Sequence, residues 1–174
     1  ASDVYKRQLV YGALCVALSF MLSYIKLFSL PMGGSLTLCS MLPIAAYACA
    51  FGPLYGFVAG LAFGMLQLIQ DFYVIHWAQL LLDYFFAFAC YGIAAYFPNK
   101  LTLGIAVAGL CRMLCSTLSG GIFFADSAVD AGWSNAWLYS LAYNGSTIGA
   151  ETVLCVLVSL LPPVKKVLGL MKSE

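Results

Sequence analysis

The sequence predicts an all-α integral membrane protein with six transmembrane helices and with both termini in the cytoplasm. Of its 174 residues, 63% are hydrophobic and only 9% are charged, whereas a soluble domain carries about 25% charged residues. The apolar residues form runs close to the length that a helix needs to cross a bilayer, about 20 residues. Lysine and arginine fall mostly on one side of these runs, as they do in the cytoplasmic loops of membrane proteins.

Six apolar runs are expected to form the spans, and turn residues separate them. Their expected limits are 9–28, 36–51, 54–70, 76–97, 102–124 and 136–161. Segments rich in proline and glycine end the first, second, fourth and sixth runs, because these residues interrupt helices. Polar loops at 70–75 and 125–135 follow the third and fifth runs. The chain is therefore predicted to fold as one helical bundle.

The basic residues predict the orientation of the bundle. With the N-terminus inside, only Lys26 falls on the outer side, and the cytoplasmic side holds Lys6, Arg7, Lys100, Lys165, Lys166 and Lys172. The six-helix domain is expected at 9–165 and a cytoplasmic tail at 166–174. The polar segment 1–8 does not resemble a signal peptide, which ends in a cleavage site after its apolar region. It need not be native to the protein, and no function is assigned to it.

Three of the predicted spans carry polar residues at helical spacing, so that each set falls on one face. The sets are His76, Gln79 and Asp83; Arg112, Ser116 and Ser119; and Ser140, Asn144, Thr147 and Glu151. Serine and threonine can simply join helices in a membrane. An ionisable residue costs roughly 2.5–3.5 kcal/mol at a helix centre, so the three charged residues require partners.

Depth separates the three charged residues. At a rise of about 1.5 Å per residue, Arg112 lies roughly 18 Å and Glu151 roughly 21 Å below the outer ends of their helices. They are therefore predicted to form a structural ion pair. Asp83 lies only roughly 10 Å below the outer end of its helix and has no predicted protein cation. It is the candidate to bind a cationic ligand; the alternative is a hydrogen bond from a serine or tyrosine of another helix.

Aromatic residues gather at the depth of Asp83. They are Tyr73, Trp77, Tyr84, Phe123, Phe124, Trp133, Trp137, Tyr139 and Tyr143. Such belts are ordinary at membrane interfaces, and this is the alternative interpretation. An acid among aromatic rings also suits a flat organic cation, which the ring faces attract. Asn144 can donate and accept hydrogen bonds at the edge of a heterocycle.

The sequence lacks the motifs of several other classes of protein. It contains no GxxxxGK[ST] phosphate loop, no HExxH and no GxSxG, and no nucleophile accompanies its single histidine. The seven cysteines include no CxxC, and Cys111 with Cys115 would supply half a metal site. A net charge of +1 without a basic aromatic patch excludes nucleic-acid binding. We expect no enzyme, cofactor or metal, but a binding subunit that depends on a separate ATPase.

Four segments in order carry a resemblance to a known family: GGSLTL with MLP at 33–43, HWAQLLLDY at 76–84, SGGIFF at 119–124 and WLYSLAYNGS at 137–146. Together they resemble the thiamine-specific S-components of energy-coupling factor (ECF) transporters, over about residues 9–165. The resemblance implies a six-helix protein of a bacterial plasma membrane that binds thiamine on its outer face. It also implies three partner subunits, one transmembrane coupling protein and two ATPases, besides membrane lipid.

The resemblance also implies residue roles. The substrate-binding residues of the family correspond here to Tyr73, Asp83, Tyr84, Ser116, Gly120, Phe124, Tyr139 and Asn144. Asp83 would face the thiazolium, and Tyr139 with Asn144 would engage the pyrimidine. Phe124, Ser116 and Gly34 stand where some members have a stacking Trp, a pocket His and a Trp in the lid loop at 29–35.

The resemblance further implies that Ala13 and Ala17 contact the coupling protein. Small residues at this spacing let a second helix approach closely. Two other hypotheses stay open. The ligand could be another aromatic or cationic vitamin, or the chain could be a structural or assembly membrane protein with no ligand.

Overall fold

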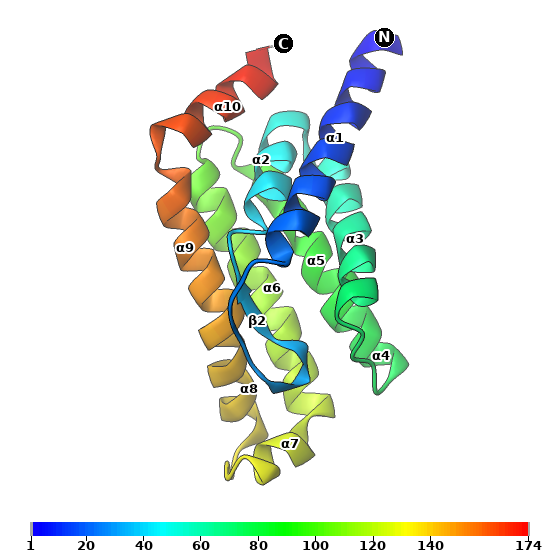
Figure 1. Ribbon diagram of the computed structural model, residues 1–174, viewed down its shortest axis with the longest axis vertical. Coiled ribbons are helices and arrows are strands. Elements are labelled where there is room, and N and C mark those ends of the chain that lie inside the picture. Colours follow the sequence, from blue (N-terminus) through cyan, green and yellow to red (C-terminus); the bar gives the residue numbers. More distant parts are fainter. Residues whose placement is uncertain (1, 174) are drawn as a thin grey trace.

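The computed structural model describes residues 2–173; residues 1 and 174, at the ends of the predicted polar segment and tail, lie outside the described part. The chain forms a bundle of helices with one short β-hairpin (Figure 1). In chain order the elements are α1 (Ser2–Ser23), β1 (Lys26–Ser29), η1 (Pro31–Gly33), β2 (Ser35–Thr37), α2 (Leu42–Phe51), α3 (Pro53–Gln70), α4 (Trp77–Leu80), η2 (Leu81–Phe86), α5 (Ala87–Ala89), η3 (Cys90–Tyr96), α6 (Leu101–Phe123), α7 (Ala125–Asp130), α8 (Ala136–Asn144), η4 (Gly145–Gly149), α9 (Ala150–Ser159) and α10 (Pro162–Ser173).

Two of the long helices are continuous but change their winding. The helix from α4 to η3 contains a π-helical segment, η2, and ends in a 3₁₀ segment, η3. The helix from α8 to α9 contains a second π-helical segment, η4. Such segments occur mostly as local widenings of α-helices and often lie at functional sites. Asp83 and Tyr84 lie within the first of them.

Four helices within residues 2–173 are long and apolar enough to cross a membrane: Pro53–Gln70, Trp77–Tyr96, Leu101–Phe123 and Ala136–Ser159. The apolar helix α2 has only 10 residues. Figure 1 shows both chain ends at one end of the bundle, with α4 and α7 toward the other end. The fold is therefore that of a multi-pass helical protein, while the count of six spans and the side of the termini stay predictions.

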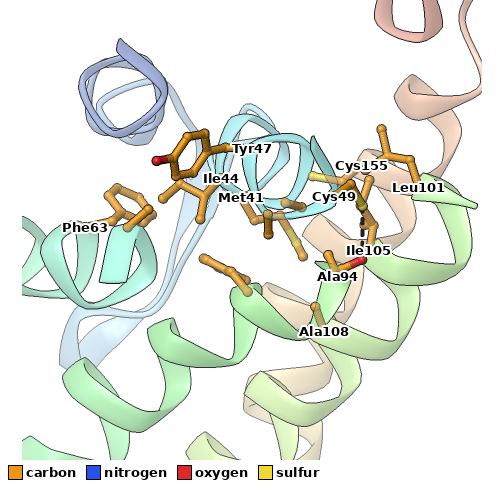
Figure 2. Close-up of a cluster of buried hydrophobic side chains, with 14 of the residues drawn as sticks. Met41, Ile44, Tyr47, Cys49, Phe63, Ala94, Leu101, Ile105, Ala108 and Cys155 are labelled. Carbon is orange, nitrogen blue, oxygen red and sulfur yellow. Dashed lines mark hydrogen bonds between the residues drawn. The ribbon is translucent and has the colours of Figure 1, made fainter. Parts of the chain in front are cut away.

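The main hydrophobic core surrounds α2 and joins it to α3, η3, α6 and α9. Figure 2 shows its side chains, among them Met41, Ile44, Tyr47, Cys49, Phe63, Ala94, Leu101, Ile105, Ala108 and Cys155. The Cys49 thiol donates a hydrogen bond to the carbonyl of Ala94, Sγ to O 3.0 Å. The cysteines of the described part are free thiols, and no group of three or more potential metal ligands occurs there.

Close packing at glycines brings α3 against the helix that carries Asp83. A Cβ added at Gly60 would meet the carbonyl of Phe88, and one added at Gly64 would meet the carbonyl of Tyr84. Because backbone atoms cannot move aside as a flexible side chain can, larger residues would separate the two helices. These glycines therefore fix the position of η2.

Several predicted helix boundaries are wrong. The first helix begins at Ser2 and ends at Ser23 rather than covering 9–28, and residues 26–37 form an antiparallel hairpin, so the chain is not entirely helical. The second helix begins at Leu42 rather than 36. The loop at 125–135 contains α7. The prolines at 162 and 163 start a further helix, because proline fits the first turn of a helix.

Candidate ligand-binding site

A cavity of about 150 Å³ lies between the hairpin and the helices α3, α4–η2, α6 and α8–α9. All eight predicted substrate-binding residues line it, as do Arg112 and Glu151. The other lining residues are Met32, Gly33, Gly34, Ser35, Thr37, Ser40, Gln67, Asp71, Gln79, Phe88, Ser140, Tyr143, Thr147 and Ile148. The fold thus brings residues from all three predicted polar sets to one cavity, although His76 and Ser119 do not line it.

Asp83 presents a carboxylate to this cavity. Its Oδ2 accepts hydrogen bonds from Gln79 Nε2 at 2.9 Å and from Ser119 Oγ at 2.8 Å. The second bond is the contact between helices that the sequence left as an alternative. Ser116 and the more distant guanidinium of Arg112 also interact with the carboxylate, but no ion pair of Asp83 occurs within residues 2–173. One carboxylate oxygen is thus held in place by neutral donors, and the negative charge has no cationic partner within ion-pair distance.

The loop before α4 is attached to the same helix as Asp83. The hydroxyl of Tyr84 donates to the carbonyl of Asp71 at 2.6 Å and accepts from the backbone N–H of Tyr73 at 3.2 Å. Gln79, only 2% exposed, donates to the carbonyl of Tyr73 at 3.2 Å as well as to Asp83. Gln79 therefore links the position of the loop to the orientation of the carboxylate.

Aromatic rings form one wall of the cavity. Tyr73 stacks on Phe124, with ring centroids 5.9 Å apart and an angle of 26° between the ring planes. Next to them, His76 stacks on Phe123 with centroids 5.0 Å apart; its Nδ1 accepts the backbone N–H of Ala78 and so caps α4. Parallel rings present flat faces, and such faces attract both aromatic and cationic ligands.

A polar edge faces this wall from α8. Asn144 Nδ2 donates to the carbonyl of Ser140 at 2.9 Å, and the Ser140 hydroxyl donates to the carbonyl of Thr117 at 2.8 Å. These bonds leave the Oδ1 of Asn144 without a hydrogen bond from residues 2–173. A Cβ at Gly120 would collide with Oγ of Ser140, so glycine lets α6 and α8 approach here. The amide oxygen of Asn144 can accept a hydrogen bond from a ligand.

The tip of the hairpin covers the cavity and is attached to α8. Tyr143 donates its hydroxyl proton to the carbonyl of Pro31 and accepts the N–H of Gly34, N to O 2.8 Å. Its ring occupies the space that a side chain at Gly34 would need. The tip also contains Met32 and Gly33 in left-handed conformations, at φ 64° and 85°. Tyr143 therefore stands where the lid loop would otherwise place a side chain of its own.

Arg112 and Glu151 lie together at the other side of the cavity. Arg112 Nη1 lies 3.7 Å from Glu151 Oε2, longer than the 2.7–2.9 Å of a charge-assisted hydrogen bond. The guanidinium hydrogen-bonds to the hydroxyl of Tyr91 and lies over the ring of Phe88, 4.4 Å from its centroid. The two charges are thus neighbours, but each has its closest contacts with other groups.

Glu151 is held chiefly by the last residue of β2 and by Ser40, which follows the hairpin. Its Oε1 accepts hydrogen bonds from Thr37 Oγ1 at 2.6 Å, Ser40 Oγ at 2.7 Å and the Ser40 N–H at 2.9 Å. Thr37 and Ser40 were not predicted as site residues, because residues 36–51 were expected to form a helix. Gln79 was predicted to share a polar helical face with Asp83 but was not assigned to the binding site.

Ala13 and Ala17 are both exposed on α1, away from the cavity. Exposure on one face leaves these two small residues accessible to another helix, as the sequence analysis expected for a contact with a partner. Contact with a partner remains a prediction.

The fold and cavity define the class of this chain: a multi-pass helical membrane protein with a cavity of small-molecule size. Residues 9–170 match the family described as "Thiamine transporter protein (Thia_YuaJ)". The chain is also 31% identical over 147 residues to the thiamine transporter ThiT of Bacillus subtilis (strain 168), covering 75% of each chain. This chain belongs to the thiamine transporter family.

A solved structure of ThiT from Listeria monocytogenes has the same fold. The two structures superpose with a TM-score of 0.78 over 100% of this chain and 97% of the other, at 20% sequence identity. The family is one of transporters, which places this chain in the bacterial plasma membrane as a multi-pass protein. The helices that are long and apolar enough to cross a membrane agree with this location.

Proposed function

We propose that this chain is the thiamine-binding subunit, or S-component, of an ECF-type vitamin transporter, and that it captures thiamine on the outer face of the membrane. The observation that carries the proposal is the carboxylate of Asp83. It lies in a cavity with stacked aromatic rings and, among residues 2–173, has no protein cation within ion-pair distance. Thiamine supplies the missing positive charge on a flat ring.

The polar groups of the cavity suggest how thiamine would lie. The thiazolium would face Asp83, because opposite charges attract strongly where water is excluded. Ser116 and Tyr84 line the cavity beside that carboxylate. The aminopyrimidine would lie toward α8, where Asn144 Oδ1 can accept a hydrogen bond from the exocyclic amine and the Tyr139 hydroxyl can bind a ring nitrogen. Tyr73 and Phe124 would cover the ring faces.

Import would require partner subunits, because the sequence contains no phosphate-binding loop. We propose one transmembrane coupling protein and two ATPase subunits as these partners. Ala13 and Ala17 on the exposed face of α1 would allow close approach of the coupling protein. The chain itself would bind its ligand without ATP, and ATP hydrolysis by the partners would drive release into the cell.

Titration of the purified chain with thiamine tests the proposed ligand. Trp133 packs against the ring of Tyr139, which lines the cavity, and Trp137 lies two residues before Tyr139 on the same helix. Both Trp side chains are half exposed, so their fluorescence should change on binding. We expect saturation below about 1 μM, which corresponds to a binding free energy of about −8 kcal/mol or better. Absence of saturation would contradict the proposal. Competition with other aromatic and cationic vitamins distinguishes a thiamine site from a site of broader specificity.

A further inference from the structure

A single helix is hydrogen-bonded to both the tip and the base of the β-hairpin. Tyr143 binds the hairpin tip at Pro31 and Gly34. Glu151 binds the hairpin base, defined here as residues 37–40, through the three hydrogen bonds to its Oε1. Tyr143 and Glu151 lie eight residues apart on the same continuous helix, Ala136–Ser159. The hairpin therefore takes its position over the cavity from a single rigid element.

The π-helical segment η4 lies between these two attachment residues. In a regular α-helix, eight residues turn through about 80° more than two full turns, so the two side chains would point in different directions. A π-helical turn contains more residues and therefore rotates less per residue. The segment at Gly145–Gly149 thus reduces the angle between Tyr143 and Glu151, and both reach the same hairpin.

The hydrogen bonds at the hairpin base are strong because their acceptor is the buried carboxylate of Glu151. Glu151 is only 2% exposed, and a buried carboxylate is costly unless donors surround it. Arg112 contributes one loose contact, whereas the hairpin base contributes two hydroxyls and one N–H. Movement of the base away from Glu151 would leave the carboxylate without these donors. The charge therefore opposes opening of the hairpin.

We propose that Glu151 is a positioning residue that, with Tyr143, fixes the hairpin over the cavity and thereby sets the rate at which the ligand leaves. In this role its pairing with Arg112 is secondary. The part of the proposal that concerns release rests on the proposed function, because it needs a bound ligand. The part that concerns the hairpin does not.

The experiment compares two identical substitutions in the full chain. Thr37→Val removes one hydroxyl bonded to Glu151. Thr102→Val removes a hydroxyl of α6 that is bonded to Ser159 of α9 at 3.1 Å, outside the cavity. Hydrogen exchange of the backbone amides of residues 26–37 is measured without ligand. Thiamine association and dissociation are measured by stopped-flow fluorescence. Glu151→Gln, which removes the charge, serves as a second variant at the base.

Thr37→Val should increase the rates of amide hydrogen exchange in the hairpin and of thiamine dissociation about tenfold. This is the effect expected from losing one charge-assisted hydrogen bond. Association should change by less than about threefold, since interface changes act mainly on dissociation. Thr102→Val should match the unaltered chain. Hairpin exchange in Thr37→Val at the rate of Thr102→Val would overturn the positioning role. Faster exchange with unchanged dissociation would overturn control of release. Were the unaltered chain to bind no thiamine, the proposed function would fail, and the exchange rates alone would decide the role of Glu151.

Discussion

Asp83→Asn should weaken thiamine binding by removing the charge and little else. Asparagine has nearly the same shape as aspartate, and its side-chain oxygen can still accept the hydrogen bonds from Gln79 and Ser119 that Oδ2 now receives at 2.9 and 2.8 Å. The backbone of η2 and the aromatic wall should keep their places. The change in affinity therefore reports the interaction between the carboxylate and the charge of the ligand.

Coulomb's law gives the expected size of the loss in affinity. Two opposite charges about 4 Å apart attract by about 4 kcal/mol at an effective dielectric constant of 20. Removing water from the carboxylate on binding offsets part of this attraction. We therefore expect a loss of about 2–4 kcal/mol, which weakens binding roughly 30-fold to 1000-fold.

Isothermal titration calorimetry of the unaltered chain and of Asp83→Asn measures this loss of binding free energy. Each protein is titrated with thiamine and with a neutral analogue in which carbon replaces the quaternary nitrogen. Asp83→Asn should weaken thiamine binding but leave the analogue nearly unaffected. Asp126→Asn is the matched control, because Asp126 is exposed on α7 and does not line the cavity. Equal losses for thiamine and the analogue would refute an ion pair, and an unchanged thiamine affinity would remove Asp83 from the site.

Three further substitutions test other parts of the structure. Gly64→Ala should lower the melting temperature by several degrees, because the new Cβ meets the carbonyl of Tyr84. Gly169→Ala is the control and should not lower the melting temperature, because open space surrounds Gly169. Equal shifts for the two variants would refute the packing argument. Tyr84→Phe should weaken thiamine binding about fivefold to thirtyfold by freeing the loop before α4; unchanged affinity in titration would show that this loop does not support the site. Ala17→Leu should leave thiamine binding intact but abolish uptake by the assembled transporter; normal uptake by proteoliposomes would exclude this face as the contact.

The cavity could be predicted from the sequence because helical periodicity is strong in an apolar chain. Polar residues stand out against a hydrophobic background, and their spacing places Asp83, Ser116 and Asn144 on inward faces of three helices. Depth along each helix then predicted which charges are neighbours. The structure brings these residues to one cavity, as the facing stripes indicated. Their roles toward a ligand stay predictions.

The hairpin could not be predicted in the same way. Residues 26–37 form a short, partly apolar segment joined to α1 without a strong helix-ending residue. The sequence therefore predicted helix at 26–28 and 36–37 and a loop only at 29–35. Their conformation depends on distant partners: Lys26 forms an ion pair with Asp71 at 2.7 Å, and Tyr143 and Glu151 attach the tip and base. Contacts of this kind, between residues more than 40 positions apart, leave no periodic signal in the local sequence.

The π-helical segments escaped prediction for a related reason. A single widened turn changes the direction of every side chain beyond it but alters composition very little. Regular helical spacing placed Asp83 correctly because few residues separate it from the start of its helix. Over the longer interval from Tyr143 to Glu151, the same spacing gave no reason to expect both side chains on one face.

The short connection between α1 and the hairpin has a mechanical consequence. α1 ends at Ser23 and β1 begins at Lys26, so only two residues join the helix to the cover of the cavity. Two residues span at most about 7 Å when fully extended, and they cannot absorb a larger displacement. A protein that tilts α1 from its exposed side would therefore pull directly on the cover. Because Ala13 and Ala17 lie on that exposed side, a displacement of α1 at their surface would be transmitted to the hairpin.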